Sequence, residues 1–484
     1  MEFKLNNRKV LSDELKYQIH KQFPFAPTAE QEKALDVFSA YITDRNSKSA
    51  MILRGSAGTG KTTLAGAIVK TMVELKQKVI LLAPTGRAAK VFSLNSSHDA
   101  FTIHRRIYRQ KSFSGDIGVF NLNDNLYCDT LFIIDEASMI SNQSISESAF
   151  GSGRLLDDLI QYVYSGQNCR MMLIGDNAQL PPIGEEESPA LISDILRGYS
   201  LNVYDIGLNE VLRQSQQSGI LYNATVIRHM ITHDRFTELP KIRFAGFADI
   251  CMVPGDELIE SLASSYSEVG IDETMVITRS NKRANIYNQG IRNTVMGREE
   301  PLTTGDILMI VKNNYYWAER EKSNITFIAN GDRAEVQRIR NVRELYGFRF
   351  ADVWLQFPDY NDYEMQTTVI LDSLISESPS LTREQSEQLF NAVMEDYADI
   401  PLKHDRMKKI RTDIYYNALQ IKYAYAVTCH KAQGGQWAHI YLDQGYMNDN
   451  MLTPDYIHWL YTAFTRATEK LFLVNWPKVQ TENK

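Results

Sequence analysis

The stretch MILRGSAGTGKTTLAGAIV, residues 51–69, decides the fold. Its apolar start is typical of a buried strand, a glycine-rich turn follows, and a helical pattern begins at Thr63. This order matches G-x-x-x-x-G-K-[ST], in which backbone N–H groups of the turn and the helix N-terminus face an anion. By chance, such a match arises in roughly one per cent of chains this long. We therefore predict a triphosphate-binding loop at the end of a parallel-sheet strand.

This loop supplies the first candidate ATP contacts. Lys61 would lie against the β and γ phosphates, and the Thr62 hydroxyl would coordinate Mg2+. The glycines permit the tight turn that brings the backbone close to the phosphates. The predicted ATP-binding residues of this segment are Gly55, Ser56, Ala57, Gly58, Thr59, Gly60, Lys61, Thr62 and Thr63.

A metal-holding acid is expected at the end of a neighbouring strand, and TLFIIDEASMI, residues 130–140, provides one. Residues 131–134 form a continuous apolar run, which indicates a buried parallel strand. We predict that Asp135 helps to hold Mg2+ and that Glu136 polarises the water that attacks the γ phosphate. A solvated acidic turn is the alternative, and the lysine loop upstream disfavours it.

Two more apolar runs, KVILLAPT at residues 78–85 and RMMLIGD at 170–176, end where ligands collect in open α/β sheets. Pro84 and Thr85 after the first run suit contact with a phosphodiester backbone. Gln179 after the second run is placed to sense the γ phosphate. Each signal alone is weak, because turns after strands are common. Together they indicate one ATPase domain over residues 1–212.

The chain resembles a superfamily 1 helicase of the RecD-like, Dda-like group. The resemblance runs from about Pro27 to Val474 and consists of motifs that follow one another in the family's order. They are PTAEQEKAL (27–35), GSAGTGKTT (55–63), APTGRAAK (83–90), TIHRRIY (102–108), DEAS (135–138), GDNAQLPPIG (175–184), LNEVLRQ (208–214), YAVTCHKAQGGQW (425–437) and YTAFTRATEKLFLV (461–474). The resemblance implies two RecA-like motor domains and movement from 5′ to 3′ on DNA.

The resemblance also implies roles for residues outside the glycine loop. Gln31 would contact adenine, Arg213 would reach the phosphates, and Arg466 would be the arginine finger. An arginine in an ordinary salt bridge is the alternative for both arginines. Gln433 and Gly434 would face the nucleotide cleft. The predicted catalytic residues are thus Lys61, Asp135, Glu136, Gln179, Arg213 and Arg466.

Contacts to DNA are expected along one strip of motifs. In VTCHKAQGGQW, residues 427–437, a thiol beside an imidazole could suggest half of a zinc site. The four cysteines form no C-x-x-C pair, so neither a zinc site nor a disulfide framework is predicted. The stretch is better interpreted as a contact loop. The predicted DNA-binding residues are Pro84, Thr85, Arg87, Thr102, His104, Thr428 and His430.

The second motor domain is predicted over residues 213–300 and 421–484, with an inserted β-barrel-like module and helical extension at 301–420. Four β-rich runs separated by turn signals indicate the barrel, and Asn330-Gly331 is typical of a tight turn. The resemblance implies that this insertion helps to hold single-stranded DNA. A purely structural insertion is the alternative.

A β-hairpin that splits the duplex is predicted at about residues 106–127, with an ordinary surface loop as the alternative. Phe113, Ile117, Val119 and Phe120 would give it an apolar tip or face. The aromatic cluster Tyr315, Tyr316 and Trp317 could stack on bases, although such clusters are more often core.

The composition fits a multidomain globular protein: 484 residues, 44% hydrophobic and 23% charged, with a net charge of −7. This charge counts against a simple basic nucleic-acid coat but leaves room for a local positive channel. The first residues lack a cleavage site, and no apolar run reaches about 18 residues, so we expect a cytoplasmic protein without membrane insertion.

Two classes of function fit these motifs. The first is an ATP-dependent DNA helicase or translocase on single strands, with ATP and Mg2+ as cofactors and single-stranded and forked duplex DNA as partners. The second is a nucleic-acid-stimulated ATPase that remodels protein–nucleic-acid complexes or acts on RNA without processive unwinding. A metabolic kinase or P-loop switch would not need the second motif set after residue 420. We expect a monomer that meets single-strand-binding, replication or repair proteins.

Overall fold

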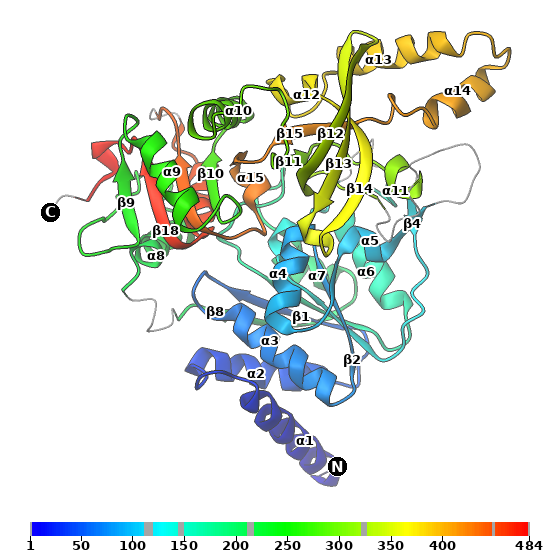
Figure 1. The fold of residues 1–484 in the computed structure, drawn as a ribbon. Helices are drawn as coiled ribbons and strands as arrows, with labels where there is room; N and C mark the ends of the chain where they lie inside the picture. The colour runs from blue at the N-terminus through cyan, green and yellow to red at the C-terminus, as the bar shows by residue number, and fades with distance from the viewer. Residues whose placement is uncertain are drawn as a thin grey trace.

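The computed structural model (Figure 1) describes residues 2–110, 120–143, 150–210, 217–320, 327–447 and 451–482. It contains two parallel β-sheets, a closed β-barrel and a two-stranded hairpin. The predicted fold class, an α/β protein with two parallel motor sheets and two β insertions, is therefore confirmed. Among the helices in the described ranges, none combines the length and the apolar composition that a membrane span requires.

Six strands form the parallel sheet of the first motor domain, a name we use for this sheet with helices α1 to α7. The strands lie in the order β3-β2-β6-β7-β1-β8. Every neighbouring pair is parallel. The bounds are β1 (Ser49–Gly55), β2 (Lys78–Ala83), β3 (Ala100–Thr102), β6 (Thr130–Ile134), β7 (Arg170–Gly175) and β8 (Asn202–Leu208).

Helices cover both faces of this sheet. On one face, Met51 and Leu53 of β1 pack with the helices α2 (Ala29–Ile42) and α3 (Lys61–Glu74), and on the other Ala50 and Ile52 pack with α6 (Leu155–Ser165). Successive side chains of a strand point to opposite faces, so both sets are buried. This explains why the central strands are continuous apolar runs in the sequence.

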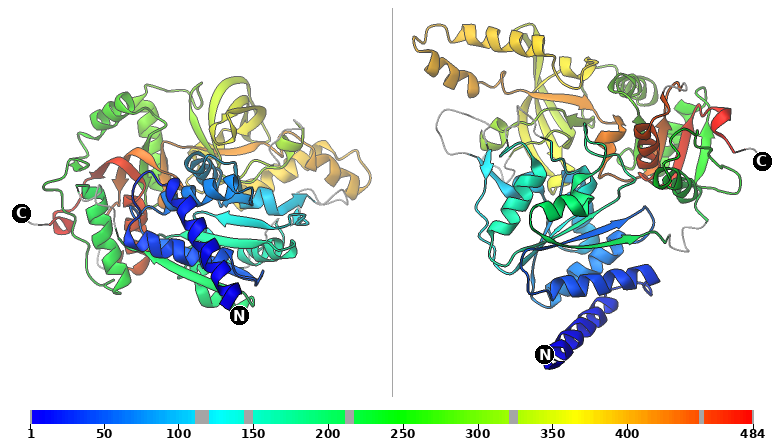
Figure 2. Two further views of the ribbon diagram at one scale, coloured as in Figure 1. Left: turned by 90° about the horizontal axis from the view of Figure 1, so that it is seen from below. Right: turned by 180° about the vertical axis from the view of Figure 1, so that it is seen from behind.

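The remaining helices of this domain are shorter or peripheral. Helix α1 (Glu2–Lys21) extends away from the body at the N-terminus (Figure 2). The others are α4 (Gly86–Ser96), α5 (Ile103–Ile107) and α7 (Ser193–Gly198).

The predicted hairpin lies beside the first sheet. Strands β4 (Tyr108–Gln110) and β5 (Phe120–Leu122) pair antiparallel. Residues 111–119, which include the predicted tip residues Phe113, Ile117 and Val119, lie outside the described residues. Phe120 is 1% exposed. The base of the hairpin is therefore part of the core.

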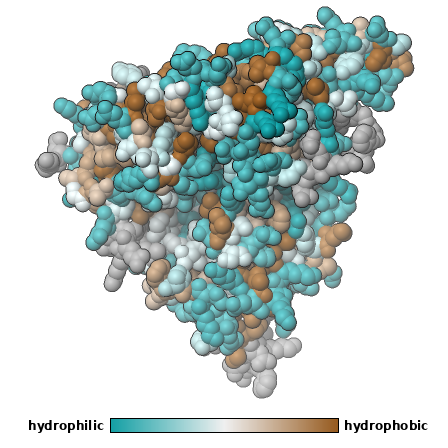
Figure 3. All heavy atoms as spheres, viewed as in Figure 1, coloured by the Kyte–Doolittle hydropathy of each residue, from teal (hydrophilic) through white to brown (hydrophobic). Residues whose placement is uncertain are grey.

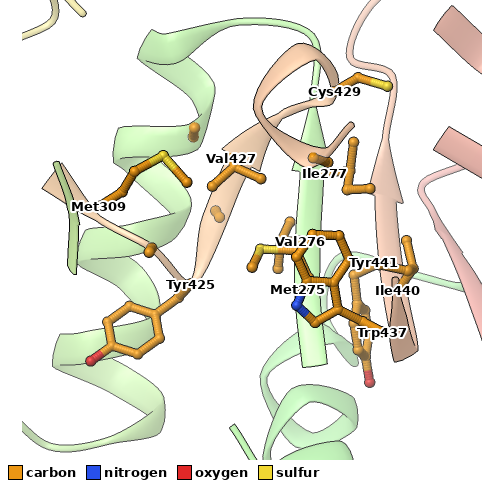
Figure 4. Packing of buried hydrophobic residues seen from close by; sticks show 14 of the residues in the cluster. Met275, Val276, Ile277, Met309, Tyr425, Val427, Cys429, Trp437, Ile440 and Tyr441 are labelled. Atoms are coloured by element: carbon orange, nitrogen blue, oxygen red, sulfur yellow. The ribbon is translucent and has the colours of Figure 1, made fainter. Parts of the chain in front are cut away.

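The second motor domain is a five-stranded parallel sheet with helices α8, α9, α10, α15 and α16. Its strand order is β16-β10-β17-β18-β9. Figure 4 shows β10 side chains packed between those of β16 and β17. The bounds are β9 (Ile250–Val253), β10 (Thr274–Thr278), β16 (Ala426–Thr428), β17 (Trp437–Asp443), β18 (Ala467–Val474), α8 (Gly219–Thr232), α9 (Leu258–Glu268), α10 (Asn281–Gly290), α15 (Cys429–Ala432) and α16 (Pro454–Phe464).

The inserted module is a closed barrel of five strands. They are β11 (Ile307–Ile310), β12 (Arg333–Leu345), β13 (Phe348–Phe357), β14 (Tyr363–Ile370) and β15 (Leu419–Tyr423). Between β14 and β15, helices α13 (Arg383–Asp396) and α14 (Lys403–Arg411) project from the barrel (Figures 1 and 2). The domain boundaries at residues 212, 300 and 420 stay predictions.

Candidate active site and nucleic-acid interface

The glycine loop between β1 and α3 has the backbone shape that an anion site requires. Gly58 and Gly60 have φ angles of 76° and 79°, in the left-handed region that favours glycine. Helix α3 begins at Lys61, and among the described residues no side chain caps its N-terminus. The free N–H groups of its first turn are therefore available to phosphate oxygens.

The side chains of the loop fold over its backbone. The Lys61 Nζ donates to the carbonyl oxygens of Gly55 at 2.6 Å and Ser56 at 2.9 Å. The Thr59 Oγ1 donates to the same Ser56 oxygen at 2.8 Å. Thr62 is exposed and Thr63 is partly exposed in the first turn of α3. Lys61 thus lies over the loop where the phosphates would bind.

Gln31 is tied to this loop. It is the third residue of α2 and forms a capping box with Thr28. Its Nε2 donates to the carbonyl oxygen of Thr59 at 3.1 Å. The side chain therefore connects helix α2 to the phosphate-binding turn, while its contact with adenine stays a prediction.

The acid pair follows β6 directly. The N–H of Asp135 donates to the Leu82 oxygen at 3.0 Å, and the N–H of Glu136 donates to Asp135 Oδ1 at 2.8 Å. Burial, reinforced by the neighbouring Glu136 charge, raises the pKa of Asp135 to about 7, and the Lys61 ammonium acts in the opposite sense. The carboxylate therefore lies within the field of Lys61.

The donor set fits one magnesium ion shared with a nucleotide. Within the described ranges, no group of three or more histidine, cysteine or acidic residues is placed to hold a metal. Mg2+ usually takes one or two carboxylates and completes its shell with water and phosphate oxygens. The Asp135 carboxylate and the Thr62 hydroxyl would provide that minimal protein set.

The loop after β7 is held by the second motor domain. The N–H of Leu180 donates to Thr462 Oγ1 at 2.7 Å, and the Leu180 oxygen accepts from Gln433 Nε2 at 2.7 Å. Gln179 in this loop is 6% exposed, and its Oε1 finds no hydrogen-bond partner among the described residues. A buried acceptor without a hydrogen bond destabilises the folded protein, so the Gln179 Oε1 is available to accept a hydrogen bond from a further group.

Gly434 lies where the two motor domains touch. Its φ is 73°, and a Cβ there would lie 3.0 Å from the Cβ of Ala88 and 3.1 Å from Thr85 Oγ1. The positive φ favours glycine, and a side chain at this position would crowd Ala88 and Thr85. The structure thus places Gly434 against the start of α4; its contact with ATP stays a prediction.

Of the two predicted arginines, Arg466 lies within the described residues and Arg213 does not. Arg466 is 2% exposed, and its guanidinium donates to the Thr462 oxygen at 3.1 Å, to the Gly435 oxygen and to Thr465 Oγ1, both at 3.2 Å. These acceptors all belong to the second motor domain. Arg213 lies outside the described residues. The roles of both arginines at the γ phosphate stay predictions.

Two residues that the sequence did not single out reach the glycine loop from the second motor domain. Arg228 of α8 donates from Nη1 to Ser56 Oγ at 3.0 Å. Tyr461 of α16 accepts from the Ala57 N–H at 3.1 Å. A tyrosine buried inside a helix needs a polar partner for its hydroxyl, which is the sequence signal for this contact.

The predicted DNA-contact residues of the first motor domain serve as local structural anchors. Pro84 follows β2 directly, Thr85 caps α4, and Thr102 caps α5. Arg87 donates from Nη2 to the Gln436 oxygen at 3.2 Å, across the domain interface. It thus brings the APTGRAAK and VTCHKAQGGQW motifs together.

His104 lies in an aromatic environment. Its ring centroid is 4.9 Å from that of Phe150, and burial lowers its pKa to about 4. The imidazole is therefore neutral at pH 7, so any contact with DNA would be a hydrogen bond or a packing contact rather than an ion pair.

In the second motor domain, the predicted contacts lie at the start of α15. Thr428 is partly exposed, and His430 is exposed. Lys431, which was not predicted, follows directly, and burial lowers its pKa to about 8. Cys429 is fully buried, and burial raises its pKa to about 12, which excludes a reactive thiolate at neutral pH.

A cleft of about 600 Å³ lies between the first motor domain and the barrel. Lys90, Arg105 and Arg106 line it from one side, and Tyr360 and Tyr363 line it from the other. Cationic side chains beside aromatic rings are typical of surfaces that bind single-stranded nucleic acid, although the carboxylates of Asp99 and Asp359 also line this cleft.

The aromatic cluster at residues 315–317 belongs mainly to the core. Trp317 is 4% exposed and donates from Nε1 to the Asn417 oxygen at 2.8 Å. Tyr315 packs on Phe120 at 4.7 Å between ring centroids. The segment between β11 and β12 therefore contacts the base of the hairpin through Tyr315.

Comparisons with known proteins agree with this geometry. The AAA domain model matches residues 28–230, and the UvrD-like helicase C-terminal domain model matches residues 423–474. The uncharacterized protein MJ1519 of Methanocaldococcus jannaschii is 24% identical over 92% of this chain, and the match spans 38% of that protein. The ATP-dependent DNA helicase dda of Enterobacteria phage T4 is 26% identical over 58% of this chain and 60% of its own length.

Among solved structures, Pif1 helicase from Bacteroides in complex with ADP-AlF3 and single-stranded DNA matches at 14% identity and a TM-score of 0.46, with 95% of each chain covered. The order of the motifs and the two family models indicate an AAA domain followed by a UvrD-like helicase C-terminal domain. Together with the relatives in sequence, they make the chain similar to the RecD-like, Dda-like group of superfamily 1 helicases.

Proposed function

We propose that this chain is an ATP-dependent DNA helicase that translocates from 5′ to 3′ on a single strand and separates the duplex at a fork. One observation supports this most directly. The glycine loop of the first motor domain lies against Arg228 and Tyr461 of the second. A nucleotide bound to that loop would therefore lie at the junction of two domains, where hydrolysis can drive their relative movement.

The residues around this junction would divide the work of hydrolysis. The backbone of the loop and Lys61 would hold the phosphates, and Asp135 with Thr62 would hold Mg2+, which would neutralise phosphate charge when bound. Glu136 would accept the proton of the attacking water. Arg466, turned from its present acceptors, would stabilise the charge that develops on the γ phosphate.

The polarity and the substrate can be tested with forked DNA that carries either a 5′ or a 3′ single-stranded tail, in the presence of ATP and Mg2+. We expect unwinding only with the 5′ tail. Unwinding that needs the 3′ tail would reverse the proposed polarity. ATP hydrolysis that DNA or RNA stimulates without any strand separation would favour the remodelling ATPase instead. The cytoplasmic location, the monomeric state and protein partners stay predictions.

We also propose that the hairpin separates the strands. A deletion of residues 112–121 would remove Phe120, which packs against Tyr315 and Phe150. A sharper test shortens only residues 112–118 and keeps this core contact. DNA-stimulated ATPase should remain while unwinding is lost. Intact unwinding by the shortened variant would place the separating element elsewhere.

A further inference from the structure

Tyr461 connects the second motor domain to two separate loops of the first. It lies on α16 and is 1% exposed. Its hydroxyl accepts from the N–H of Ala57 in the glycine loop at 3.1 Å and donates to Asp176 Oδ2 at 2.5 Å. One oxygen atom therefore joins α16, the phosphate-binding loop and the loop after β7.

The direction of these hydrogen bonds is fixed by charge. Burial, followed by the negative charge of Asp176, raises the pKa of Tyr461 well above its usual value. The hydroxyl therefore keeps its proton, which it donates to the carboxylate, and its lone pairs remain for Ala57. Asp176 is 3% exposed, and its Oδ1 accepts from the Ala178 N–H at 3.0 Å. Both ends of the contact are thus held in place.

Among the described residues of the first motor domain, the neighbouring α16 side chains Thr462 and His458 contact the loop after β7. Thr462 Oγ1 accepts from the Leu180 N–H at 2.7 Å, and His458 Nδ1 lies 2.9 Å from the Ala178 oxygen. Of these three α16 side chains, Tyr461 is the one that also contacts the glycine loop. The same helix leads to Arg466, whose Nε donates to the Thr462 oxygen at 3.1 Å.

We propose that Tyr461 is a positioning residue for ATP hydrolysis. Its hydroxyl fixes the position of α16, and with it Arg466, relative to the phosphate-binding loop. The inference rests on the proposed ATPase function. Lys61, Asp135 and Glu136 all lie in the first motor domain, so nucleotide binding would survive without the tyrosine hydroxyl. The chemical step would suffer, because small displacements of a catalytic group are costly.

The test compares Tyr461→Phe with Tyr456→Phe. Tyr456 lies on the same helix and is equally buried, but its hydroxyl bonds Gln444 and Gln480 within the second motor domain. With saturating single-stranded DNA, Tyr461→Phe should lower kcat about 10-fold relative to the control variant, with KM for ATP changed by less than about 3-fold. Equal kcat in the two variants, or a rise in KM with kcat unchanged, would overturn the proposal.

A second measurement does not depend on hydrolysis. Amide exchange in the peptide that contains Ala57 should be faster in Tyr461→Phe than in Tyr456→Phe, because only the first variant removes an acceptor from that N–H. Equal exchange would show that the contact does not hold the loop and would also overturn the proposal. If the unaltered protein hydrolyses no ATP, the proposed function fails, whereas the exchange result still decides the contact.

Discussion

The two motor domains are built alike, yet their strand ends differ. In the first domain, β1 leads to α3 through left-handed glycines, and no side chain caps the helix. In the second, β10 leads to α10, and the Ser280 hydroxyl caps that helix by accepting from the Arg283 N–H at 3.2 Å. A capped helix start offers fewer free N–H groups to an anion. The loop, rather than the parallel sheet, therefore determines which domain can bind a nucleotide.

The second domain contributes side chains instead of a phosphate cradle. Three of its side chains form hydrogen bonds with backbone groups of the first domain, namely Gln433, Tyr461 and Thr462. Arg228 donates a hydrogen bond to the Ser56 hydroxyl in the glycine loop. Hydrophilic side chains cover much of the outer face shown in Figure 3. The hydrogen bonds that Leu180 makes with Gln433 and Thr462 across the domains are buried.

The largest expected effect tests the difference between the two helix starts. Lys61→Ala should reduce DNA-stimulated phosphate release by about 10³-fold or more, because the side chain that neutralises the phosphates is lost. Ser280→Ala, at the corresponding place in the other sheet, should leave KM for ATP unchanged and cost about 1 kcal/mol of stability. A change in ATP affinity in Ser280→Ala would show that the start of α10 also contacts the nucleotide.

A smaller loss is expected when the acid pair is altered. Glu136→Gln should bind ATP normally and hydrolyse it about 10² to 10³ times more slowly, because an amide cannot accept the proton of water. Rapid-quench turnover and fluorescent-nucleotide binding measure the two properties separately. Glu187→Gln, on an exposed loop, is the control. Normal turnover by the Glu136 variant would remove it from the role of base.

A substitution at Gly434 tests the contact between the two motor domains. Gly434→Ala would force a left-handed alanine and a Cβ at 3.0 Å from Ala88, so we expect a loss of about 1–3 kcal/mol in unfolding free energy and weaker stimulation of ATPase by DNA. Gly246→Ala is a matched control, because its φ is 88° and no atom of the described part of the chain lies within 4 Å of its added Cβ. If both variants behave alike, backbone strain rather than the domain contact explains the loss.

The smallest effect concerns the predicted DNA-contact loop of the second domain. Burial lowers the pKa of Lys431 to about 8, so its ammonium is charged below that pH and neutral above it. Its contribution to phosphate binding should be present at pH 7 and lost as the pH rises through about 8. Lys431→Ala should weaken single-strand binding a few-fold at pH 7 and lower the salt slope by about 1.

Fluorescence anisotropy titrations at several salt concentrations measure the effect of Lys431→Ala. Lys403→Ala on the projecting helix α14 is the control and should change neither the affinity nor the salt slope. An unchanged slope in the Lys431 variant would place that lysine away from the DNA.

The sequence alone determined the architecture of the nucleotide side. The glycine positions, the lysine and the acid pair are contiguous in the chain, and the apolar runs predicted strands that the structure contains. These features follow from local rules, namely allowed φ angles and burial of both sheet faces. The barrel could be predicted for the same reason, from alternating runs between turn residues.

Only the tertiary structure revealed which side chains meet across the domains. Ala57 and Tyr461 are 404 residues apart, and Ser56 and Arg228 are 172 apart. No local pattern encodes such a pair, because its geometry depends on how two sheets, a barrel and a hairpin pack together. The roles at the strand ends were thus predictable from short motifs. The relative position of the two motor domains follows instead from long-range packing, which a linear pattern does not contain.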